Sequence, residues 1–86
     1  MQFQGAVIRE QNVTFAIIVV KPSVLNDSYK AQETVIGFGR YFPGVPVVLM
    51  AQDLRGVPTY YGRKDIVQFM SRVPLHAIEW KSYTAD

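Results

Sequence analysis

Two stretches of the sequence contain almost no polar residue, and they constrain the fold more than any other feature. Val13–Val20 reads VTFAIIVV, and Val45–Ala51 reads VPVVLMA. Both are far shorter than the roughly 20 apolar residues that a membrane-spanning helix needs. A strand with one face in water alternates polar and apolar residues, and neither stretch does so. We therefore predict two central strands whose side chains are covered on both faces of a sheet.

Turn residues and helical spacing mark the elements around the first of these strands. Phe3–Arg9 reads as a mixed strand, and the turn at Glu10–Asn12 joins it to Val13–Val20 in an antiparallel hairpin. A helix is expected over about Asp27–Tyr41. The residues near its main stripe, at helical spacing, are Leu25, Tyr29, Gln32, Ile36 and Gly39, and Val35, Phe38 and Phe42 lie beside this stripe.

The second apolar strand begins a similar series. Gln52–Gly56 reads as a hairpin loop, and Val57–Tyr61 is the strand that returns from it. Pro58 places that strand at an edge of the sheet or makes its start irregular, because proline cannot donate to a ladder of hydrogen bonds. A short helix is expected over about Arg63–Val73, followed by a last strand over His76–Trp80.

The order of these elements is ββαββαβ, and a chain of 86 residues has the size of one domain. We predict a single α+β domain over residues 1–86, with a mainly antiparallel or mixed sheet of about five strands and two helices. Lys81–Asp86 could form a flexible tail. The pattern does not determine the order of the strands within the sheet.

The two apolar strands raise the question of what covers them. Hydrophobic residues make up 49% of the chain and charged residues only 19%, which is rich for a domain with so much surface. If both helices pack on one face, the other face lacks a cover, and a second copy that stacks its sheet or shares an edge would supply one. We therefore expect a homodimer, with Tyr61, Trp80 and Tyr83 at its interface.

The chain has no cysteine, which excludes disulfides, thiolate metal sites and a cysteine nucleophile. Small secreted domains usually carry disulfides. The first residues also lack the basic segment and apolar run of a signal peptide. We expect a cytoplasmic protein.

Groups that could carry catalysis or bind a metal are sparse. His76 is the only imidazole, and the seven carboxylates are scattered along the chain. Zinc and iron sites need clustered nitrogen or sulfur ligands, and the chain has no calcium-loop spacing. We predict no catalytic residue, no metal site and no cofactor, and so a protein that is not an enzyme.

The best local candidate for a site is a strand that runs through glycine into the start of a helix. Free backbone N–H groups and the helix dipole favour an anion at such a start. The candidate residues are Tyr60, Tyr61, Gly62, Arg63 and Lys64. The two cations would hold a phosphate or carboxylate, and a tyrosine would be a wall or hydroxyl donor. The alternative is an ordinary solvated helix start in which Asp65 compensates the cations.

The sequence therefore supports two hypotheses of function. The first is a small non-enzymatic binding or adaptor domain, which associates with itself through aromatic and edge-strand surface and could also bind another protein. The second is an anion-ligand or nucleic-acid module that uses the helix start at Gly62–Lys64. A net charge of +2 permits an acidic partner without arguing for one. No membrane partner is expected.

Overall fold

The strands form one mixed sheet in the computed structural model, which describes residues 1–85. They are β1 (Gln2–Glu10), β2 (Val13–Val19), β3 (Val47–Gln52), β4 (Pro58–Tyr61) and β5 (Lys81–Thr84). The order across the sheet is β4-β3-β2-β1-β5, and within the described residues only β2 and β3 are neighbours that run parallel. The prediction of a small α+β domain with a mixed sheet and the order ββαββαβ is confirmed.

The first hairpin has the shortest common connection. Glu10 pairs with Val13, and the two residues between them, Gln11 and Asn12, have φ angles of 48° and 67°. Two-residue turns with both central residues at positive φ match the twist of the strands that they join. The predicted hairpin is therefore confirmed, together with its turn.

The helices are α1 (Pro22–Leu25), α2 (Ser28–Gly39), α3 (Lys64–Met70) and a 3₁₀ turn, η1 (Leu75–Ala77). The sequence analysis did not predict α1, a single turn with proline in its first position. Asp27 caps α2, because its Oδ1 accepts hydrogen bonds from the N–H groups of Tyr29 at 3.0 Å and Lys30 at 3.3 Å. Such a cap satisfies donors that the first turn leaves free.

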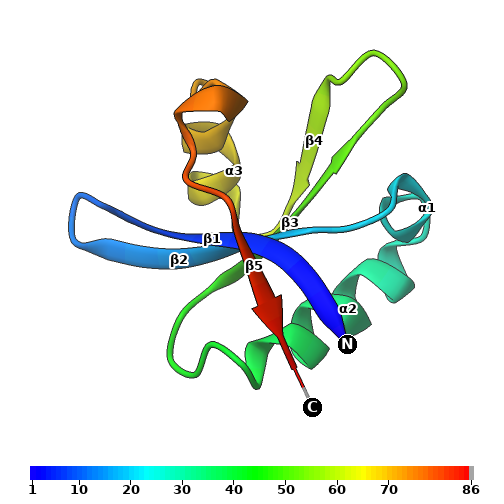
Figure 1. The fold of residues 1–86 in the computed structure, drawn as a ribbon, viewed down its shortest axis with the longest axis horizontal. Coiled ribbons are helices and arrows are strands. Elements are labelled where there is room, and N and C mark those ends of the chain that lie inside the picture. The colour runs from blue at the N-terminus through cyan, green and yellow to red at the C-terminus, as the bar shows by residue number, and fades with distance from the viewer. Residues whose placement is uncertain (86) are drawn as a thin grey trace.

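The two longer helices pack on opposite faces of the sheet (Figure 1). Phe15, Ile17, Val48 and Met50 point to one face and form a core with α3, which we call the α3 face. The alternate residues of the same strands point to the other face and pack under α1 and α2, which we call the α2 face; they are Ala16, Ile18, Val47 and Leu49. The sheet is therefore the middle layer of three.

This arrangement answers the question of cover within the single chain. Ile17 and Ile18 are neighbours on opposite faces, and both are 0% exposed. The prediction of central strands buried on both faces is confirmed. The premise that both helices share one face is wrong, so the central strands need no second copy to shelter them. Self-association stays a prediction, but an uncovered face of the sheet no longer supports it.

The predicted last strand is wrong, and so is the tail over Lys81–Thr84. His76–Trp80 does not form a strand, because this segment crosses the α3 face between α3 and the far edge of the sheet. Ile78 is buried in the core of that face. Trp80 packs against the same core and donates from Nε1 to the Leu75 carbonyl at 3.3 Å.

Strand β5 forms where the flexible tail was expected. It pairs with β1 in antiparallel register from Gln2 to Gly5. The Tyr83 ring stacks on Phe3 with centroids 5.2 Å apart. Beyond the strand, Ala85 N donates to the Met1 carbonyl at 2.8 Å. Asp86 lies outside the described residues.

Candidate functional site

One end of the sheet combines an open strand edge with surface hollows. β4 is the last strand on its side, and no strand within residues 1–85 pairs with its outer edge. The loop before it is ordered by Asp53, whose Oδ1 accepts from the N–H groups of Arg55 at 2.8 Å and Val57 at 2.9 Å. Gly56 closes the loop at a φ of 83°. The predicted hairpin loop and the edge position indicated by Pro58 are both confirmed.

The hydrogen-bond register of this hairpin shows which backbone groups face outward. Asp53 N donates to the Val57 carbonyl at 3.0 Å, so this opposed pair is hydrogen-bonded. Bonded and non-bonded pairs alternate along an antiparallel ladder. Thr59 and Tyr61 therefore turn their backbone groups toward β3, whereas Pro58 and Tyr60 turn theirs toward solvent. Tyr60 offers a free N–H and C=O at the edge, and Pro58 removes no ladder bond.

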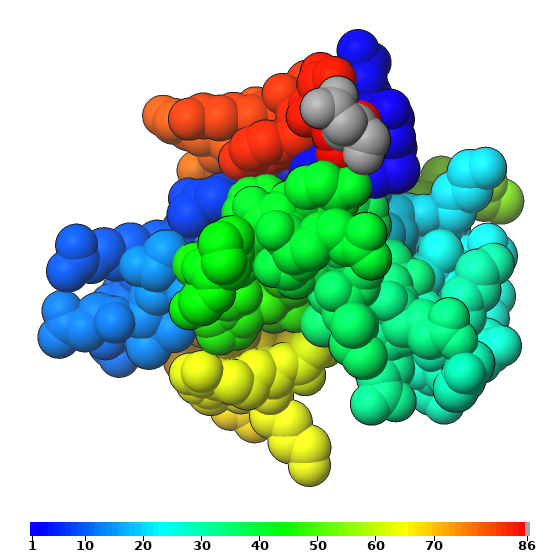
Figure 2. Space-filling view, turned by 90° about the horizontal axis from the view of Figure 1, so that it is seen from below, coloured from blue at the N-terminus to red at the C-terminus, as the bar shows by residue number. Residues whose placement is uncertain are grey.

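A hollow borders β4 on each face of the sheet. The α3-side hollow has a volume of about 260 Å³ and is lined by Tyr60, Tyr61, Gly62, Lys64, Val67 and Gln68. The α2-side hollow, of about 430 Å³, is lined by Gln32, Val35, Ile36, Val47, Tyr61, Gly62 and Arg63. Figure 2 shows the second hollow as a notch between α2, in blue-green, and the yellow segment near Gly62.

Gly62 is explained by a close approach to β3. A Cβ atom at this position would lie 2.9 Å from Val48 Cγ2 and 3.3 Å from the Val47 carbonyl oxygen. The chain passes from β4 into α3 directly over the central strand, and a larger residue would collide with it. The glycine is therefore required for packing, whether or not an anion binds nearby.

The two cations of the predicted anion site have different environments. Arg63 donates from Nε and Nη2 to the two carboxylate oxygens of Asp65, each at 2.7 Å. This hydrogen-bonded pair holds the pKa of the exposed Asp65 carboxyl at about 2, below its usual range. Lys64 has no carboxylate within salt-bridge distance among the described residues. The guanidinium is therefore already occupied, and Lys64 is the cation left for a ligand.

Tyr60 carries an unusual polar group into the hydrophobic surroundings of the α3 face. Its hydroxyl oxygen is buried and has no hydrogen-bond partner in the described chain. Burial raises the pKa of Tyr60 above its ordinary value. Its neighbour Tyr61 packs with the core of the α2 face instead. The two tyrosines thus line opposite faces of one strand, as strand alternation requires.

The predicted site residues are only partly brought together. Tyr60, Tyr61, Gly62 and Lys64 surround one hollow, while the Arg63 side chain is held by Asp65. The predicted interface residues do not form one surface. Trp80 packs beside the α3-face core, and Tyr83 lies on β5 at the opposite edge from Tyr61.

Residues that the sequence analysis missed border the same end of the molecule. Ile36 lines the α2-side hollow and is 70% exposed, and Tyr29 on the same helix is equally exposed. The expected apolar stripe placed both against the sheet, and this was wrong. The helix packs through Val35 and Phe38, which the sequence analysis placed beside the stripe, and through Ala31, which it did not name. An apolar residue on almost every side of α2 is the signal that some must face solvent.

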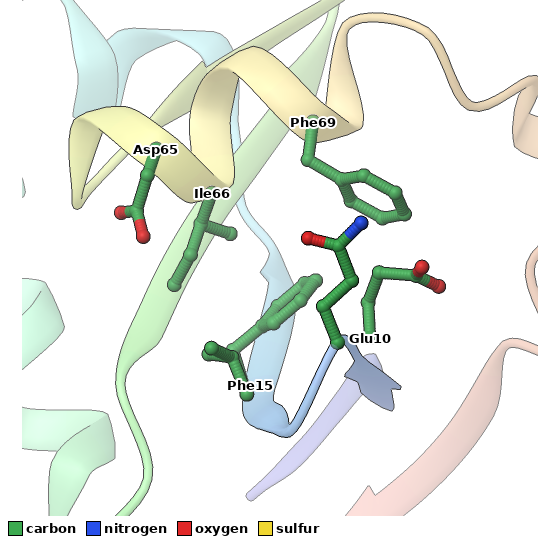
Figure 3. Close-up of a pocket in the computed structure, with 7 residues that line it drawn as sticks. Glu10, Phe15, Asp65, Ile66 and Phe69 are labelled. Carbon is green, nitrogen blue, oxygen red and sulfur yellow. The ribbon is translucent and has the colours of Figure 1, made fainter.

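A third hollow lies between the first hairpin turn and α3 (Figure 3). It has a volume of about 160 Å³, and Phe15 and Phe69 form its apolar floor with ring centroids 6.3 Å apart. Glu10 and Asp65 contribute carboxylates to its rim, but Asp65 is paired with Arg63. Within residues 1–85, no three metal-binding side chains cluster here or elsewhere. This hollow offers no recognisable catalytic pair.

No helix in the described part of the chain has the length and apolar character needed to cross a bilayer. Comparisons of this chain with protein-family models, with curated proteins and with solved structures found no match.

Proposed function

We propose that this chain is a non-enzymatic binding module, which accepts an extended segment of a protein partner alongside β4. One observation carries the proposal: β4 is an uncharged edge strand with outward backbone groups and a hollow on each of its faces. Extended segments bind other domains by adding a strand to a sheet. Main-chain hydrogen bonds then supply affinity, and pockets for alternate side chains supply specificity.

The other stretches of open edge suit an added strand less well. β1 continues past the paired region with β5, and this continuation ends in Arg9 and Glu10. β5 begins with Lys81. Natural sheets discourage edge pairing with such charged residues. β4 carries no charge between Pro58 and Tyr61, so its side chains do not oppose an incoming strand.

The two hollows would receive alternate side chains of the added strand. On the α2 side, Val35, Ile36 and Tyr61 present apolar surface and favour an apolar side chain. On the α3 side, Lys64 and Gln68 lie beside Tyr60 and favour a polar or acidic one. We therefore expect a partner segment that alternates in polarity. The absence of cysteine fits a reducing compartment, and the cytoplasm is part of the same proposal.

Peptides selected from a random library displayed on phage provide the test. Each selected peptide is synthesised and titrated into the ¹⁵N-labelled protein. We expect the largest chemical-shift changes at Thr59–Gly62 and along the adjacent face of α2. Peptides methylated on the backbone nitrogens that face β4 should lose most of their affinity, because methylation removes a main-chain donor.

A matched pair of variants isolates the backbone contribution of Tyr60. Tyr60→Ala removes the side chain and keeps the outward N–H, whereas Tyr60→Pro removes both. Proline is tolerated where an edge N–H faces solvent, so both variants should keep the fold, which circular dichroism checks. We expect Tyr60→Pro to bind peptide at least tenfold more weakly than Tyr60→Ala. Equal affinities, or shift changes confined to other surfaces, would overturn the proposal.

A further inference from the structure

An exposed apolar side chain lies at the start of β4. Val57 is 55% exposed although it directly precedes the strand. It stands opposite Asp53, and this pair continues the register in which Ala51 faces Thr59 and Leu49 faces Tyr61. Leu49 and Tyr61 belong to the α2-face core. By alternation, Val57 also points to the α2 face.

The α2-side hollow lies at the other end of the same strand. Tyr61 and Gly62 line it, and the exposed apolar side chain of Ile36 lines it from α2. The four residues of β4 span about 13 Å at 3.3 Å per residue. One copy thus presents an apolar side chain at the start of the strand and an apolar hollow at its end, on the same face. Antiparallel pairing brings the start of one strand beside the end of another.

The outward groups of β4 determine where such a pair would be centred. Tyr60 is the residue of the strand that turns both an N–H and a C=O outward. Two copies related by a twofold axis can exchange both hydrogen bonds between their Tyr60 residues. Thr59 then stands opposite the partner's Tyr61, and Pro58 opposite the partner's Gly62. Val57 lies diagonally from the partner's Tyr61, beside the partner's α2-side hollow.

We infer that two copies of this chain form a twofold dimer through an antiparallel β4–β4 pair centred on Tyr60. Val57 of each copy packs over the α2-side hollow of the other. The inference rests on the proposed function, since it names a second copy as one occupant of the β4 edge. The interface is isologous, because each copy supplies the same projection and the same hollow. No like charges meet across the strands, since β4 has no charged residue.

Cysteine cross-linking tests the register, because the native chain has no cysteine to interfere. Hydrogen-bonded residue pairs have Cα atoms about 5.5 Å apart, which is within the range of a disulfide. Oxidised Tyr60→Cys should therefore become mostly a covalent dimer. In Thr59→Cys the two cysteines would be diagonal, at about 7–8 Å, and should cross-link several-fold less. Equal cross-linking of both variants, or of Ser82→Cys on β5, would overturn the register.

Sedimentation of the native chain over a concentration series tests the dimer itself. Val57→Lys replaces the apolar side chain over the partner's α2-side hollow with a charged one, which is costly to bury, and should raise the dissociation constant at least tenfold. Val7→Lys is the matched control, because Val7 is 51% exposed on β1, away from β4. This control should change the constant less than twofold. A native chain that stays monomeric up to about 1 mM overturns the dimer, and so does an unchanged constant in Val57→Lys.

The outcomes also separate this inference from the proposed function. If the chain is a strict monomer that still binds selected peptides at β4, the dimer inference is wrong and the proposed function stands. Failure of both experiments overturns both ideas. If both hold, selected peptides must compete with dimerisation, since they require the same outward groups of Tyr60.

Discussion

β4 and β5 form the two ends of one sheet, but they differ in what protects them. Both strands are four residues long. β5 begins with Lys81, and Tyr83 packs it against an aromatic cluster with Phe3 and Phe42. β4 has no charge and lies between two hollows. The comparison shows that position alone does not make an edge available: the side chains on and around the strand decide it.

The largest change in the free energy of unfolding is expected at Tyr83, which packs β5 against Phe3 and Phe42. Tyr83→Ala removes a ring that contacts Phe3 at a centroid distance of 5.2 Å and Phe42 at 5.6 Å. We expect a loss of about 2–3 kcal/mol in the free energy of unfolding, measured by urea denaturation. Tyr29→Ala should cost less than about 0.5 kcal/mol, since Tyr29 is mostly exposed. Similar losses in the two variants would show that aromatic packing does not hold β5.

At the end of β4, the backbone of Gly62 packs closely against β3, with no room for a side chain. In Gly62→Ala, the added methyl group would lie 2.9 Å from Val48 Cγ2. We expect a loss of about 1–3 kcal/mol from this overpacking. Gly37→Ala is the control, because its added Cβ would meet nothing within 4 Å, and it should stabilise α2 by up to about 1 kcal/mol. Thermal unfolding of both variants decides whether Gly62 is a packing requirement.

A lysine on β4, like the one on β5, should make the β4 edge as unfavourable for pairing with another strand as the β5 edge. Thr59→Lys places a lysine on the open edge, at an exposed position. We expect the dissociation constant of the dimer to rise about tenfold, which corresponds to about 1.4 kcal/mol. Thr84→Lys at the β5 edge is the control and should leave it unchanged. Sedimentation that finds the opposite order would locate the interface at β5.

The buried hydroxyl of Tyr60 should contribute nothing favourable to stability in the single chain. Tyr60→Phe removes an oxygen that has no hydrogen-bond partner in the described residues. We expect the free energy of unfolding to stay the same or to rise by up to about 1 kcal/mol. A loss of more than about 1 kcal/mol would mean that the hydroxyl has a partner in solution, such as a bound water.

The smallest effect concerns the ion pair beside β4. The folded pKa of Asp65, about 2, lies below the ordinary value of 3.8. Its contribution to stability is therefore fully present above the unfolded pKa and is lost as the pH falls through about 2. NMR titration should find this midpoint, and Arg63→Gln should return it toward 3.8. An unchanged midpoint in the variant would exclude Arg63 as the cause.

Local sequence was enough to predict most of the elements that build the candidate site. Proline at position 58 predicted an edge strand or an irregular strand start, of which the edge strand is found, and the glycine at position 56 predicted a hairpin loop. The hollows could not be predicted, because they depend on which helix residues face β4. Ile36 lies near the expected apolar stripe but is exposed, because α2 turns Ala31, Val35 and Phe38 toward the sheet. Compensation of the cations by Asp65 was one of the two alternatives drawn from the sequence, and the side-chain geometry decides that Arg63 is the cation it pairs with.

By itself, the sequence determined the two buried strands, the two hairpins and the single α+β domain, because hydrophobic pattern and turn residues act over a few neighbours. Only the tertiary structure decided how the faces are covered, the order of the strands and that β5 forms the second edge. A parallel pair such as β2 and β3 needs a crossover, and α2 supplies it on one face, while α3 packs on the other. The segment Lys81–Thr84 became a strand because Phe3 and Phe42 give Tyr83 a place to pack. Contacts between residues so distant in the chain leave no periodic signal in the sequence.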